Sequence, residues 1–123
     1  MIIIGDKFIP YEKFELIKSI EDIKNTSSNS IVVFDFDKEI LSYCLDNSVK
    51  SCVKVSNITE AIICNTLESR YIIVPNSISK EIQEIAVNYL FDSKVLVEIK
   101  DEQEIETHAK NSIDGVIYNT ILK

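Results

Sequence analysis

The stretch of sequence that decides the fold is Ser30-Ile31-Val32-Val33-Phe34-Asp35-Phe36-Asp37. Consecutive large apolar residues between polar turn residues and acids are typical of a strand that is buried on both faces of a parallel sheet. Because side chains alternate along a strand, Asp35 and Asp37 are expected on the same face, about 7 Å apart. No other part of the chain directs two acids together from the end of a core strand.

Short apolar runs alternate with helix-like patterns along the rest of the chain. The pattern predicts strands over 2–4, 31–36, 52–55, 71–74, 94–99 and 116–122, and helices over 38–45, 58–67, 79–91 and 102–110. Such alternation indicates βαβ crossovers. The sequence therefore predicts an α/β fold in one domain, residues 1–123, with a single mostly parallel sheet of five to six strands and alternating helices. This fold would be doubly wound and flavodoxin- or receiver-like, and half of a (βα)8 barrel is the alternative.

Residues 11–24 fit two structures. Leu16, Ile17, Ile20 and Ile23 share one helical stripe, which predicts an amphipathic helix that starts close to Pro10. A strand over 14–18 followed by a very short helix is the competing interpretation. We expect the helix.

Composition limits the partners and the location of the protein. Twenty acids against 13 bases give a net charge of −7, which repels nucleic acid and anionic lipid, so neither is expected as a partner. The N-terminus has no signal-peptide pattern and no apolar run is long enough to span a bilayer, which favours a cytoplasmic protein. The three cysteines have no CxxC spacing and are expected to be buried thiols.

Polar side chains follow each predicted strand, where ligands bind in open α/β sheets. Helix capping explains most of them, because Asn57 and Asp101 each have an acid three residues further on. Asp35 and Asp37 remain as a speculative Mg²⁺ site, since this cation prefers one or two carboxylates with water. No other cofactor is expected, because the two glycines cannot form a phosphate-binding loop. His108, the single histidine, is expected on the solvated face of its helix.

Parts of the chain resemble three known families. Phe34-Asp35-Phe36-Asp37 resembles the nucleophile motif of haloacid dehalogenase-like phosphotransferases, but Glu39 stands where that motif has Thr or Val. The chain also resembles response-regulator receiver domains in length and rhythm, but Asn57 stands where they carry the phosphorylated aspartate. Residues 53–61 and 101–117 are similar in rhythm to repeats of phosphate-binding (βα)8 barrels, whose Gly-Ser-like turn is replaced by Asn119-Thr120. None of these activities carries over.

Asp35, Lys54 and Glu98 each interrupt an apolar strand, which is costly in a sheet covered on both faces. Either the three charges form one cluster, or one face of the sheet is open to solvent or to a partner. We favour the open face, and expect a homo-oligomer or another protein partner to bind there or at the helix end Tyr89-Leu90-Phe91. The leading hypothesis is a non-enzymatic binding, interaction or regulatory domain. The alternative is a Mg²⁺-dependent phosphoryl-transfer or hydrolytic enzyme that uses Asp35 and Asp37, and a small-molecule sensor comes third.

Overall fold

The computed structural model describes residues 1–123 and contains one seven-stranded sheet in which every neighbouring pair of strands is parallel. Along the sheet the order is β1-β7-β6-β5-β4-β3-β2. The strands are β1 Ile2–Ile4, β2 Phe14–Leu16, β3 Ile31–Asp35, β4 Ser51–Lys54, β5 Tyr71–Val74, β6 Lys94–Ile99 and β7 Gly115–Tyr118. The α/β class with a single parallel sheet is confirmed, and the strands number seven instead of the expected five to six.

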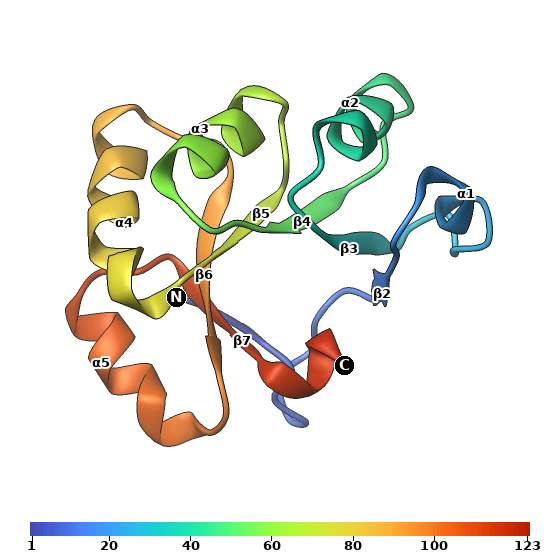
Figure 1. Ribbon diagram of the computed structural model, residues 1–123. Helices are drawn as coiled ribbons and strands as arrows, with labels where there is room; N and C mark the ends of the chain where they lie inside the picture. Colours follow the sequence, from blue (N-terminus) through green and yellow to red (C-terminus); the bar gives the residue numbers. More distant parts are fainter.

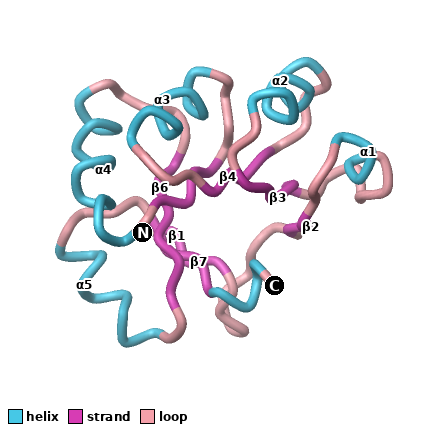
Figure 2. The backbone as a smooth tube through the Cα atoms, in the orientation of Figure 1, coloured by secondary structure: helices cyan, strands magenta, loops and turns pink.

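All the helices lie on one side of this sheet (Figures 1 and 2). They are α1 Ile20–Ile23, α2 Lys38–Asp46, α3 Ile58–Thr66, α4 Ser79–Asn88 and α5 Ile105–Lys110, with 3₁₀ turns η1 Asn76–Ile78, η2 Glu102–Glu104 and η3 Asn119–Leu122. Strands β2 to β7 are neighbours in chain order, so crossovers of the same hand place their helices on the same face. The sheet curls away from the helices into a half-barrel whose two edges are β1 and β2. None of the helices is long and apolar enough to cross a membrane.

The curl divides the buried residues into an outer core and an inner core. The outer core, between sheet and helices, holds 18 buried residues, among them Val32, Leu41 and Ile82. The inner core lies on the face turned away from the helices and holds seven: Ile4, Ile31, Val33, Cys52, Ile73, Leu96 and Ile117. Ile121 and Leu122 of η3 pack against this inner core, so the C-terminal turn fills part of the hollow of the half-barrel (Figure 1).

The helix predicted over residues 11–24 is wrong, and the competing interpretation is correct. Residues 14–16 form β2, which pairs with β3 in the register Phe14↔Ile31, and the strand-like pairing continues where the Ile17 amide donates to the Val33 carbonyl at 2.9 Å. The helix starts only after Ser19, whose hydroxyl and the Asp22 carboxylate cap each other's backbone amides. Pairing with β3 therefore outweighs the helical stripe.

The last strand is shorter than predicted. β7 ends at Tyr118, because its partner residues in β1 and β6 end at Ile4 and Ile99. Beyond that point no neighbouring strand can accept hydrogen bonds, and residues 119–122 turn inward as η3. Gly115 lets β1 approach, since a Cβ atom there would lie 2.6 Å from the Ile2 Cβ atom.

The four longer helices end in the same way, although none of them ends on glycine. Ser48, Glu68, Leu90 and Ser112 follow the C-caps of α2, α3, α4 and α5 with φ between 54° and 62°. The next residue then donates its amide five residues back, as from Val49 to the Cys44 carbonyl at 2.9 Å. This is the Schellman arrangement, in which glycine is the favoured residue because a Cβ atom is strained at positive φ.

Replacing Ser112 with glycine should therefore stabilise the protein. Ser112 is exposed at φ 58° and its side chain makes no hydrogen bond, so Ser112→Gly relieves strain without removing a contact. We expect a gain of about 1 kcal/mol in the free energy of unfolding, measured by urea denaturation. Ser112→Ala keeps the Cβ atom and is the matched control, so an equal gain in both variants would contradict the explanation.

Candidate functional site

Three charged side chains stand together on the inner face, at the carboxyl ends of the strands. Asp35 and Lys54 are directly opposite each other in the pairing of β3 with β4. The Lys54 Nζ atom reaches across β5 to the Glu98 Oε1 atom of β6, at 3.6 Å. Asp35 is on the inner face because it follows Ile31 and Val33 at two-residue spacing. The row therefore alternates acid, base and acid along the sheet.

Pockets adjoin this row on two sides. One has a volume of about 640 Å³ and is lined by Val33, Asp35, Lys54, Ile73 and Leu122 together with residues of the β2–α1 segment. The other, of about 470 Å³, lies between β4 and β6 and includes both Lys54 and Glu98. Lys54 and Ile73 line both pockets. The lysine therefore lies between the two pockets, next to an apolar side chain that they share.

The open inner face is present, and the expected cluster is present in part, because Asp35 makes no ion pair with Lys54 or Glu98. Lys54 and Glu98 pair with each other, and their side chains keep 56% and 38% exposure because no helix covers the inner face. Such exposure leaves the charges largely hydrated, so the strands carry them without the cost of full burial. The charges remain accessible from outside the protein.

Asp35 and Asp37 do not share this location. The Asp37 Oδ1 atom accepts the amides of Glu39 and Ile40, at 2.9 and 3.1 Å, and so caps α2. Asp37 is absent from the lining of the pocket that contains Asp35. No three acidic, histidine or cysteine side chains gather as they would around a metal ion. The two-carboxylate Mg²⁺ site stays a prediction.

The capping roles predicted from sequence are confirmed. The Asn57 side chain accepts the Glu60 amide at 2.9 Å, while the Glu60 carboxylate accepts the Ser56 amide at 2.8 Å. Asp101 and Glu104 form the corresponding capping box at η2. Hydrogen bonds from the Lys100 and Asp101 amides hold the pKa of Glu104 below its ordinary value. These polar side chains serve the helix ends.

The placement of His108 was predicted wrongly. Only 4% of its surface is exposed, and its Nδ1 atom has no hydrogen-bond partner. The reason is its spacing, because His108 follows the half-buried Ile105 by three residues and so shares its face of α5. The next residue of α5, Ala109, is exposed.

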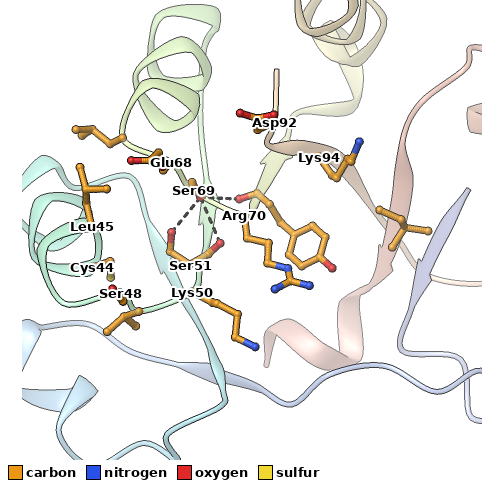
Figure 3. A pocket seen from close by; sticks show the side chains of 14 residues that line it. Cys44, Leu45, Ser48, Lys50, Ser51, Glu68, Ser69, Arg70, Asp92 and Lys94 are labelled. Carbon is orange, nitrogen blue, oxygen red and sulfur yellow. Dashed lines mark hydrogen bonds between the residues drawn. The ribbon is translucent and has the colours of Figure 1, made fainter. Parts of the chain in front are cut away.

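A second cluster of charges lies at the opposite end of the strands and was not anticipated from the sequence. Figure 3 shows this pocket, of about 780 Å³, with Lys50 and Arg70 at its side. Glu12, from the connection between β1 and β2, bridges them: Lys50 Nζ is 2.9 Å from Oε2, and Arg70 Nη2 is 3.0 Å from Oε1. The hydrogen bond from Lys50 lowers the pKa of Glu12, burial opposes this shift, and the charge of Arg70 adds to it.

Buried serines form the floor of the same end. The Ser51 and Ser69 hydroxyls lie 3.1 Å apart, and the Ser69 hydroxyl also reaches the carbonyls of Ser51 and Tyr71 (Figure 3). The Ser93 hydroxyl donates to the Ser69 carbonyl. A serine at or just before the start of an apolar strand recurs in the sequence, at Ser30, Ser51, Ser69 and Ser93, and this repetition is the signal that could have revealed the hydrogen bonds among the last three. The Ser30 hydroxyl is buried without a hydrogen-bond partner.

The comparisons with known proteins add no relative. No protein-family model matches the chain, and no curated protein is significantly similar to it. The evidence for function therefore comes from the geometry of the chain itself.

Substitutions at Asp37 and Asp35 should separate capping from other roles. Asp37→Ala removes the cap of α2 and should cost about 1 kcal/mol of stability, whereas Asp37→Asn keeps an acceptor and should cost far less. Asp35→Asn, at an exposed position, should change stability by no more than about 0.5 kcal/mol. Urea denaturation of the three variants measures these losses of stability. A loss at Asp35→Asn as large as that of Asp37→Ala would show that Asp35 is structural.

Proposed function

We propose that the chain is a non-catalytic binding domain that holds a small zwitterionic ligand on the inner face of the half-barrel. The observation that carries the proposal is the alternating row of Asp35, Lys54 and Glu98 at the carboxyl ends of β3, β4 and β6. In barrels and open parallel sheets this end of the strands is where ligands bind. A ligand with one amine and one acidic group matches the signs of the row.

The ion pair within the row is weak enough for a ligand to replace it. The Lys54–Glu98 distance of 3.6 Å is long for a charge-assisted hydrogen bond, and both side chains are more than one-third exposed. Exposed pairs of this kind contribute about 0–1 kcal/mol. A ligand amine can therefore bind Glu98 or Asp35, while its acidic group binds Lys54.

The surroundings of the row suit a ligand of modest size. The larger adjoining pocket has a volume of about 640 Å³ and brings Val33, Ile73 and Leu122 beside the charges. Sites for small molecules combine such an apolar wall with a few polar groups that fix orientation. Leu122 belongs to η3, so the C-terminal turn supplies one wall of the site.

Binding is testable with a panel of simple compounds. Thermal melting should show stabilisation by one or more α-amino acids at millimolar concentration, and not by the matching amines or carboxylic acids alone, because binding to the native state raises stability by mass action. Lys54→Met should abolish the shift, and Lys80→Met, on the exposed side of α4, is the matched control. An unchanged shift in Lys54→Met would refute this site.

The same panel includes MgCl₂, because a Mg²⁺-dependent enzyme that uses Asp35 and Asp37 was the alternative predicted from sequence. A stabilisation by Mg²⁺ that disappears in both Asp35→Asn and Asp37→Asn would favour that alternative over the zwitterion site. The Asp37→Asn variant is informative here, because asparagine still caps α2 but carries no charge.

Self-association is the second part of the proposal, with another copy of the chain as the partner. At the end of α4, Tyr89 is 77% exposed and Leu90 is 84% exposed, while Phe91 is half-buried against the outer core. A two-fold contact uses the same patch on both copies, so these side chains can cover each other. Light scattering at micromolar concentration should give the mass of a dimer, and Leu90→Glu should give a monomer. A monomeric mass for the unmodified chain would rule this out.

A further inference from the structure

The carboxylate of Glu12 is held in a two-pronged arrangement that is typical of anion recognition. Each of its oxygens has its own cation, Lys50 Nζ at 2.9 Å and Arg70 Nη2 at 3.0 Å. The two cations come from the residues just before β4 and β5, which are neighbours in the sheet. The clamp formed by Lys50 and Arg70 is thus built by the scaffold, and Glu12 is brought to it from elsewhere in the sequence.

Arg70 is oriented by its surroundings. Its guanidinium lies 5.9 Å from the centre of the Tyr71 ring, and that ring contacts Phe14 with ring centres 5.9 Å apart. A guanidinium held against an aromatic ring presents its donors in a fixed direction. In Figure 3 the ends of Lys50 and Arg70 point to the same side, away from the two acids of the pocket, Glu68 and Asp92.

Glu12 occupies the clamp, and few other interactions hold it in place. Glu12 belongs to the connection between β1 and β2, and no hydrogen bond fixes the backbone of residues 10–12. The side chains of Glu12 and Arg70 are 37% and 46% exposed, so solvent reaches the ion pairs. A soluble anion can therefore compete for Lys50 and Arg70 without unfolding the sheet.

We propose that Lys50 and Arg70 form a binding site for a phosphate group, and that Glu12 occupies this site as an internal ligand which phosphate displaces. Two cations face a single carboxylate in the clamp, which leaves one positive charge without a partner there. A phosphate dianion neutralises both cations and offers more acceptor oxygens than a carboxylate does. The site lies at the amino ends of the strands, and is separate from the row formed by Asp35, Lys54 and Glu98.

Removing the internal ligand should strengthen phosphate binding. Exposed ion pairs are weak, so the competition from Glu12 is modest, and Glu12→Gln should bind inorganic phosphate about tenfold more tightly than the unmodified chain. The measurement is thermal melting against phosphate concentration, with NaCl adjusted to constant ionic strength. Equal affinity in the two proteins would overturn the proposal.

The clamp itself is tested in the Glu12→Gln background. Adding Arg70→Met or Lys50→Met should abolish phosphate binding, whereas Lys80→Met, on the exposed side of α4 and outside this pocket, should leave it unchanged. Retained binding in both clamp variants would mean that phosphate binds elsewhere, and would refute the site. Both variants keep the apolar stem of the replaced side chain.

A measurement on the unmodified chain does not depend on any variant folding. In ¹⁵N–¹H correlation spectra, titrated phosphate should shift the amide signals of residues 11–13 and of Lys50 and Arg70, because Glu12 leaves the clamp as phosphate enters. Shifts at Lys50 and Arg70 alone would show that Glu12 is not displaced and would refute the internal-ligand role. No shift at any of these amides would refute the site altogether.

Discussion

A parallel strand must lose water on both of its faces, and the helices of this protein cover only one of them. Consecutive crossovers of one hand put α1 to α5 on the outer face, where the larger core forms. The inner face has to be covered by what remains of the chain. Curling reduces the area to be covered, and the half-buried side chains of Phe14, Tyr71, Ile121 and Leu122 pack into the hollow.

The same constraint explains where the charges stand. Inner-face residues recur every second position, so Asp35, Lys54 and Glu98 directly continue the buried positions of Val33, Cys52 and Leu96. The lower positions are covered by neighbouring strands and by η3, and must be apolar. The upper positions reach the open rim of the half-barrel, where a charge keeps its water. Asp35 and Lys54 are in register with the buried Ile73 and Leu96, and Glu98 lies one inner-face position beyond Leu96, so the charges border the inner core at the carboxyl ends of the strands.

Features fixed by neighbouring residues were predictable from the sequence. The strand over 71–74 and the caps Asn57 and Asp101 depend on a few adjacent residues, and the structure confirms them. Residues 11–24 were misassigned because pairing with β3, a contact distant in sequence, decides their conformation. The final residues were misassigned for a similar reason, since the extent of β7 is set by the lengths of β1 and β6.

In the candidate sites, too, features set by neighbouring residues were predictable and features set by distant contacts were not. The sequence identified Asp35, Lys54 and Glu98 as charges in apolar strands, but which of them pair depends on register, which the sequence does not reveal. The clamp could not be anticipated at all, because Glu12 and Lys50 are 38 residues apart and no local pattern connects them. Its acid comes from the one connection between consecutive strands that has no helix.

The connection that has no helix joins the two edges of the half-barrel and also supplies Glu12 to the clamp. Residues 5–13 lead from one edge of the sheet, β1, to the other, β2, without the helix that joins every other pair of consecutive strands. Glu12 and the ring of Phe14 attach this crossing segment to Arg70 and Tyr71 at the start of β5. Two residues further along the inner face of β5 lies Ile73, which lines both pockets beside the charged row. β5 and the residue just before it therefore take part in both candidate sites, which lie at opposite ends of this strand.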